Sequence, residues 1–155
     1  MPNIEQLANE FRIAIESAKK ERRFIEDQWF CSFPHNCCGI TSELLARFLM
    51  DNDVQEKLIY VCGIYYNVLL ESPPHAWLET ENNIIIDITG DQFQNYPEPL
   101  RFTEPIYIGP SNDFYKLFDI RERELCDNYY PLNDIQVRRH LSRKKLYEII
   151  LEYIK

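Results

Sequence analysis

A cysteine, a histidine and an aspartate follow one another along this chain in local contexts that suit nucleophilic chemistry. Cys38 opens a stretch with helical apolar spacing, His75 begins the run His75-Ala76-Trp77-Leu78-Glu79, and Asp87 lies within the apolar run 84–88. A thiolate nucleophile needs a neighbouring base, and that base needs a partner that orients its ring and stabilises its charge. The three residues could supply these functions in that order, which predicts cysteine-dependent acyl transfer.

The expected position of Cys38 favours ionisation of its thiol. An aromatic-rich loop over 28–36, broken by Pro34, precedes it, and from Gly39 apolar residues recur at helical spacing as far as 51–53. The free amides and the dipole at a helix N-terminus favour a thiolate, and an imidazolium beside it would lower the thiol pKa further. The Cys38 amide could donate to an oxyanion, and three loop residues remain open as a second donor: Asn36, Gln28 and Trp29.

His75 and Asp87 are expected on neighbouring strands. β-Branched and aromatic residues predict strands over 58–66, 76–79 and 84–88, which suggests a small antiparallel sheet. Trp77 shares a strand face with His75 because side chains repeat every two residues, so it is a candidate contact for the base or a substrate. The Asp87 carboxylate would be costly in an apolar run without a partner, and His75 is the best candidate. Capping the turn at 89–91 is the structural alternative for Asp87.

The rest of the chain predicts an α+β fold in one domain over residues 1–155. Asn3 with Gln6 resembles a capping box, and the apolar spacing after it predicts a helix that ends near Arg23 or Phe24. Prolines punctuate an irregular segment over 97–110, which contains the short apolar run 106–108. A last helix is expected from Ile135 to Tyr153, with the basic run 138–145 as a solvated face or a docking patch.

Composition narrows the function. The chain has 25 acidic and 17 basic residues and a net charge of −8, which argues against nucleic-acid binding through phosphates. It lacks a leader-like start and a stretch of about 20 apolar residues, so we expect a cytoplasmic protein without a membrane partner. Its five cysteines lack paired spacing, which favours neither a disulfide framework nor a metal site, and no cofactor is expected. Acidic residues over 71–104 slightly favour a cationic or neutral substrate over an acidic one, with a solvated face as the alternative.

At these residues the chain resembles the transglutaminase-like branch of the papain-like cysteine hydrolase superfamily. That family has a His-Ala-Trp-apolar-Glu strand, as at 75–79, and a strand that ends in Asp, as at Asp87, although its usual Asp-Pro is Asp87-Ile88 here. Its helix-leading cysteine has small and apolar residues at fixed offsets, matched after Cys38 by Ser42, Leu44, Leu45, Phe48 and Leu49. This register favours Cys38 over the alternative nucleophile Cys37, which would place Glu43 at an apolar position.

The resemblance implies a papain-like core, in which a catalytic helix packs on a small antiparallel sheet between N- and C-terminal helices. It also implies acyl transfer through Cys38, with His75 as base and Asp87 orienting the ring. Water as acceptor would make the protein a peptidase or amidase acting on a peptide or isopeptide amide; an amine would make it a transglutaminase-type acyltransferase. The rival hypothesis is a non-catalytic peptide- or protein-binding module on the same fold, which needs no close contact between cysteine and histidine.

Overall fold

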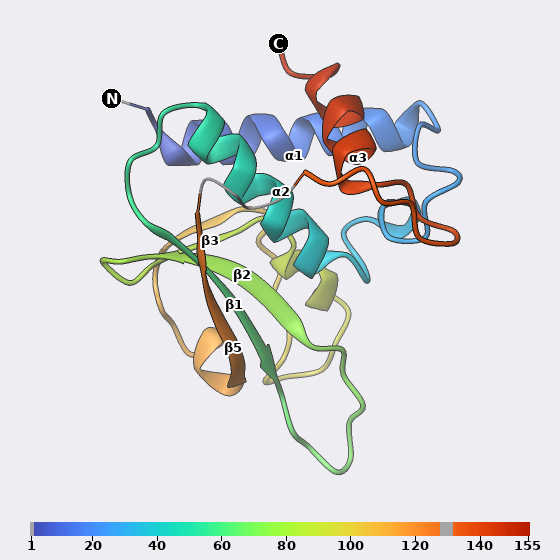
Figure 1. Cartoon of the computed structure of the whole chain (residues 1–155). Coiled ribbons are helices and arrows are strands. Elements are labelled where there is room, and N and C mark those ends of the chain that lie inside the picture. The colour runs from blue at the N-terminus through green and yellow to red at the C-terminus, as the bar shows by residue number, and fades with distance from the viewer. Residues whose placement is uncertain (1, 128–131) are drawn as a thin grey trace.

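The computed structural model describes residues 2–127 and 132–155. In these residues, three α-helices and one five-stranded antiparallel sheet form an α+β fold, as predicted. Figure 1 shows the helices gathered on one side of the sheet. The helices are α1 (Ile4–Lys20), α2 (Cys38–Asp51) and α3 (Arg143–Leu151), and the strands are β1 (Leu58–Ile64), β2 (His75–Thr80), β3 (Ile84–Asp87), β4 (Tyr107–Pro110) and β5 (Asp119–Cys126).

The central strand of the sheet is β2, in the order β4-β3-β2-β1-β5, and all six of its residues are buried. Helix α2 packs on β1 and β2, and α1 and α3 pack against α2. Because side chains alternate along a strand, β1 and β2 contribute to two apolar clusters. Ala76 and Leu78 face the helices, whereas Val61 and Trp77 join Phe93 in the cluster on the opposite face.

Most predicted elements are confirmed. The Asn3 side chain caps α1 by accepting a hydrogen bond from the Gln6 amide at 3.1 Å, although the helix ends at Lys20, before the predicted end. Helix α2 starts at Cys38, and the three predicted strands correspond to β1, β2 and β3. The short run 106–108 overlaps β4. Among the described residues, no helix combines the length and apolar character needed to cross a bilayer.

Two parts of the C-terminal third differ from the prediction. Strand β5 was not predicted because its sequence is mostly charged. In residues 2–127 and 132–155 it pairs with β1 alone, at the edge of the sheet, and most of its residues are exposed, as suits an edge. The prediction that the last helix includes Ile135 is wrong. Helix α3 begins at Arg143 behind Ser142, which accepts from the Lys145 amide at 3.1 Å, while Ile135 is 69% exposed outside it. Residues 138–142 of the basic run therefore precede the helix.

Candidate active site

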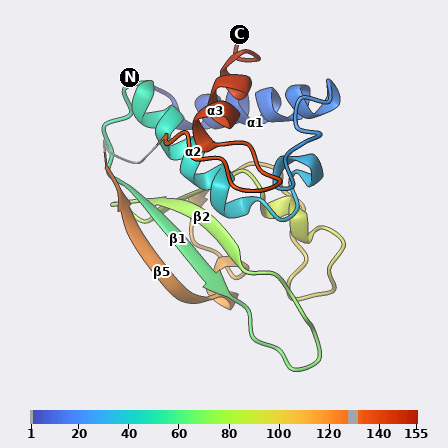
Figure 2. The same ribbon diagram turned by 45° about the vertical axis from the view of Figure 1, so that its right-hand side comes forward.

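Cys38 lies where the N-terminus of α2 meets the start of β2. Figure 2 shows this end of α2 above the part of the sheet where β2 begins. Cys38 is half-buried, and its thiol donates to the carbonyl oxygen of Pro74, the residue before β2, at 3.7 Å. Its sulfur also interacts with the imidazole of His75 through a hydrogen bond and through charge. The structure thus brings together the two residues that the sequence pairs as nucleophile and base.

The imidazole of His75 is held from its other side by Asp87. His75 Nε2 lies 2.7 Å from Asp87 Oδ2, and both side chains are almost wholly buried. Asp87 also accepts from the Thr89 amide at 2.9 Å and from the Tyr115 hydroxyl at 2.8 Å. Because a carboxylate can only accept, Nε2 carries a proton, and Nδ1 is the nitrogen left to receive one from Cys38. The three side chains therefore form a series of thiol, imidazole and carboxylate.

The pKa values of this series favour a charged cysteine and histidine. Burial opposes protonation of His75, but the charge and hydrogen bond of Asp87, together with Cys38, raise its pKa to about 9. Burial likewise opposes ionisation of Cys38, yet the hydrogen bond and charge of His75, the Ala76 amide and the Gln92 side chain together lower the pKa of this thiol. A thiolate beside an imidazolium is the reactive form of a cysteine nucleophile.

Aromatic side chains surround the His75 ring. Five rings have centroids within 6.4 Å of it: Trp77, Phe93, Phe114, Tyr115 and Phe118. Trp77 is 1% exposed, and its indole Nε1 donates to Glu79 at 3.0 Å. The structure thus places Trp77 in contact with His75, as its strand register predicts, and buries it away from the surface.

The two adjacent cysteines have different surroundings. Cys37 is 2% exposed within the apolar cluster that faces the helices, and burial raises its pKa to about 12. Cys38 is more exposed, and the pKa of its thiol is lowered. A buried, protonated thiol is a poor nucleophile, so the geometry favours Cys38, in agreement with the helix register.

The three loop residues left open as oxyanion donors lie in other surroundings. The side chains of Asn36 and Gln28 are exposed, and Gln28 uses its backbone amide to bond the Arg139 carbonyl at 2.9 Å. The Trp29 ring stacks on His140 with centroids 3.6 Å apart. None of these observations places a side-chain donor from this loop at the Cys38 sulfur.

Sequence reasoning missed Gln92, which lies on the short 3₁₀ helix η2 (Gly90–Phe93). Its side chain is 3% exposed, with Nε2 2.9 Å from His75 Nδ1. The helix η2 is fixed to α1 by Arg12, whose guanidinium bonds both oxygens of Asp91 at 2.7 and 2.8 Å. The only sequence signal for Gln92 is its position five residues after Asp87, which by itself indicates no contact.

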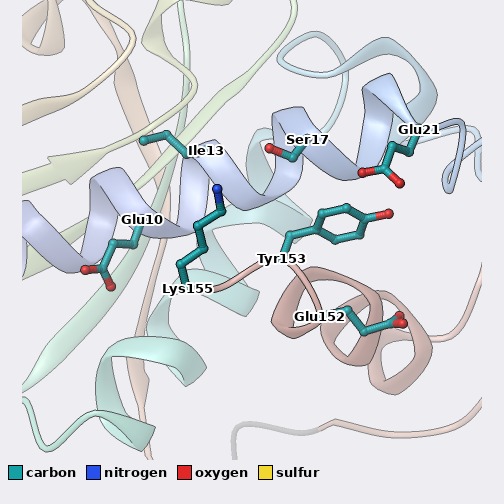
Figure 3. A pocket seen from close by; sticks show the side chains of 7 residues that line it. All are labelled: Glu10, Ile13, Ser17, Glu21, Glu152, Tyr153 and Lys155. Carbon is teal, nitrogen blue, oxygen red and sulfur yellow. The ribbon is translucent and has the colours of Figure 1, made fainter.

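Two further features lie outside this arrangement. No group of three or more His, Cys, Asp or Glu side chains in residues 2–127 and 132–155 could hold a metal ion. A hollow of about 540 Å³ lies between α1 and the C-terminal segment (Figure 3). Its lining shares no residue with the site around Cys38 and consists of Glu10, Ile13, Ser17, Glu21, Glu152, Tyr153 and Lys155.

Comparisons of the chain with protein-family models, with curated proteins and with solved structures found no match. The chemistry assigned to Cys38, His75 and Asp87 therefore rests on their geometry. That geometry is a helix-leading thiol, a buried imidazole and a buried carboxylate in hydrogen-bonded series.

Proposed function

We propose that the protein is a cysteine-dependent acyl-transfer enzyme, a peptidase or amidase that attacks a peptide or isopeptide amide through Cys38. One observation carries the proposal: His75 Nε2 is bonded to Asp87 at 2.7 Å, which leaves Nδ1 for the cysteine. Burying ionisable groups is costly, and a binding module on this fold would have no need for a buried histidine and carboxylate in hydrogen-bonded series. A papain-like core is part of the proposal, supported by a cysteine-led helix packed on an antiparallel sheet.

The reaction starts from the charged pair, in which the Cys38 thiol has transferred its proton to His75 Nδ1. The sulfur then forms a bond to the carbonyl carbon, and the carbonyl π electrons move onto the oxygen. The backbone amides of the first turn of α2 have no acceptor within the helix, so the Cys38 amide can donate to this oxyanion. When the C–N bond breaks, His75 gives its Nδ1 proton to the leaving amine, and a thioester on Cys38 remains.

The second half of the reaction regenerates the thiol. His75 takes a proton from water, the resulting hydroxide adds to the thioester carbonyl, and the C–S bond breaks to release a carboxylic acid. The thiolate recovers its proton from His75. An amine in place of water would yield a new amide by the same steps, so transferase activity uses the same three residues. Asp87 keeps the proton on Nε2 and stabilises the imidazolium, and Thr89 and Tyr115 hold its carboxylate in place.

Cysteine-resolved alkylation tests the proposal without a substrate. Iodoacetamide labelling of wild type and His75→Ala between about pH 5 and 9, mapped by mass spectrometry, gives a rate for each thiol. We expect Cys38 to react at a pH below its ordinary pKa and His75→Ala to remove this advantage. Exposed Cys31 is the internal control, and its rate should be the same in both proteins. Slow alkylation of Cys38 that does not depend on His75 would favour the binding module instead.

The acyl acceptor needs a separate assay. Wild type and Cys38→Ser are incubated with a panel of peptides, with and without added primary amines, and both proteins and products are weighed by mass spectrometry. A hydrolase yields carboxylic acid products in either condition, whereas a transferase yields amine-coupled products. Turnover that persists in Cys38→Ser would contradict the proposed nucleophile.

A further inference from the structure

The carboxamide of Gln92 touches both of the atoms between which the proton moves. Its Nε2 lies 2.9 Å from His75 Nδ1, and its side chain hydrogen-bonds the Cys38 sulfur. The side chain is 3% exposed, so water does not compete strongly for these contacts. A buried amide must find partners for its donors, and here those partners are the base and the nucleophile.

The position of the proton that Cys38 and His75 share determines what Gln92 does. His75 donates a hydrogen bond from its Nε2–H to Asp87, so neutral His75 has a lone pair on Nδ1 that can accept a hydrogen bond from Gln92. In this neutral form of the pair, the Cys38 thiol donates to the Pro74 carbonyl. Once the thiol proton moves to Nδ1, that lone pair is gone and the adjacent sulfur carries a negative charge. The Gln92 N–H must then find its acceptor at the sulfur.

We propose that Gln92 is a further catalytic residue, whose amide donates to His75 Nδ1 while the pair is neutral and to the anion once the proton has moved. The anion is first the Cys38 thiolate and then the oxygen of the attacked carbonyl, which is bonded to the carbon that joins the sulfur. Gln92 thereby takes the place of the second oxyanion donor for which the sequence offered Asn36, Gln28 and Trp29. This inference rests on the proposed function.

The surroundings of Gln92 hold its backbone firmly, as an effective donor requires. Arg12 binds Asp91, the residue before it, through two hydrogen bonds and also donates to the Ile88 carbonyl at 2.8 Å. Gly90 is so close to Phe102 that an added Cβ would lie 2.8 Å from its ring. The helix η2 is therefore fixed on two sides, and Gln92 can direct its amide at the reacting atoms with little further ordering.

Two probe reactions separate the two roles of Gln92. Iodoacetamide alkylation consumes the thiolate and forms no oxyanion, whereas acylation by p-nitrophenyl acetate passes through one. Gln92→Met removes the donors at similar length without adding charge, and Gln92→Glu replaces the donors with a carboxylate. The matched controls are Gln94→Met and Gln94→Glu, since Gln94 is exposed and only two residues away. Thermal unfolding and the rate at Cys31 monitor the fold of each variant.

We expect Gln92→Met to slow alkylation of Cys38 at pH 7 by about tenfold or more, with the midpoint of its pH profile moved upward. The rate of acylation by p-nitrophenyl acetate should fall by about tenfold or more in addition to the loss seen in alkylation, because an oxyanion donor is lost as well. Gln92→Glu should slow alkylation further because its charge repels the thiolate, and both Gln94 variants should match wild type. If Gln92→Glu does not fold, Gln92→Met alone decides the outcome.

Three results would overturn the inference. If Cys38 in Gln92→Met is alkylated with the wild-type pH profile, Gln92 does not stabilise the thiolate. A fall in rate by one factor at every pH, without a moved midpoint, indicates packing alone. Equal losses in alkylation and acylation remove the oxyanion role. In each of these three cases, the proposed function still holds if the fast alkylation of wild-type Cys38 depends on His75. Slow alkylation of wild-type Cys38 that does not depend on His75 would overturn both the proposed function and the role of Gln92.

Discussion

The strongest test of the series formed by Cys38, His75 and Asp87 is the substitution Asp87→Asn. The substitution keeps the size of the side chain and an oxygen that can accept from the Thr89 amide, but it removes the negative charge 2.7 Å from His75 Nε2. Its amide group can also donate to Nε2, which would move the remaining proton to Nδ1 and block proton transfer from Cys38. We therefore expect the fold to persist and the reactivity of Cys38 to fall.

The size of the effect follows from the burial of the ring. His75 is 0% exposed, and the charge and hydrogen bond of Asp87 are chief among the effects that raise its pKa from 6.5 to about 9. Without this carboxylate, burial should bring the pKa to 6.5 or below, a loss of about 3 kcal/mol or more in imidazolium stability. The protonated fraction at pH 7 would fall from about 99% to about a quarter or less. Alkylation of Cys38 should then slow by between about fourfold, the fall in the protonated fraction, and about 300-fold, the full change in the His75 pKa.

Two measurements check this prediction. Nitrogen-15 NMR of the imidazoles follows the protonation of His75 directly, and iodoacetamide kinetics follow the thiolate of Cys38. Asp113→Asn is the matched control, because Asp113 is exposed and the same charge is removed. A His75 pKa that stays near 9 in Asp87→Asn, or an unchanged rate at Cys38, would refute the assignment of Asp87 as the partner of the base.

Two further substitutions test the surroundings of the site. Since the folded-state pKa of Cys37 is raised from 9.0 to about 12, its thiol contributes stability below pH 9 that is lost as the pH rises toward 12. Wild type should thus lose about 1.4 kcal/mol of unfolding free energy per pH unit relative to Cys37→Ala above pH 9, measured by urea titration; parallel pH profiles would contradict this. Asp91→Asn should cost about 1.5 to 3 kcal/mol, because the buried Arg12 guanidinium loses one of its two carboxylate partners and keeps Glu16, and a cost below about 1 kcal/mol would contradict it.

The features that the sequence could predict are those with a local pattern. Helical apolar spacing after Gly39 placed Cys38 at a helix N-terminus, and the structure begins α2 at that residue. The period of two residues placed Trp77 on the face of His75, and the two rings lie 5.4 Å apart. The unusual charge at Asp87 within an apolar run demanded a partner, and His75 provides it.

The features that the sequence could not predict depend on tertiary packing. Gln92 reaches His75 from a turn that is held by an ion pair between Asp91 and Arg12, a residue of α1 far away in the chain. Strand β5 is charged because it lies at an edge, and edge strands lack the apolar alternation that strand prediction uses. Ile135 fitted a helical pattern although its side chain is largely exposed, so the pattern there reflects no packing.

The burial of the base limits how an acceptor could reach the proposed thioester. The His75 ring is 0% exposed, and aromatic rings and Asp87 occupy its surroundings, so a proton exchanges with a substrate only at Nδ1, beside the half-buried Cys38. In the proposed reaction, the leaving amine and the acceptor would therefore use the same side of the sulfur, one after the other. Water and an amine would both pass a proton to His75 Nδ1, so Cys38, His75 and Asp87 do not distinguish between these two acceptors. In the proposed reaction, the choice between hydrolysis and transfer therefore falls to groups near the half-buried Cys38 sulfur, such as the segment that leads into Pro74, whose carbonyl accepts from the Cys38 thiol.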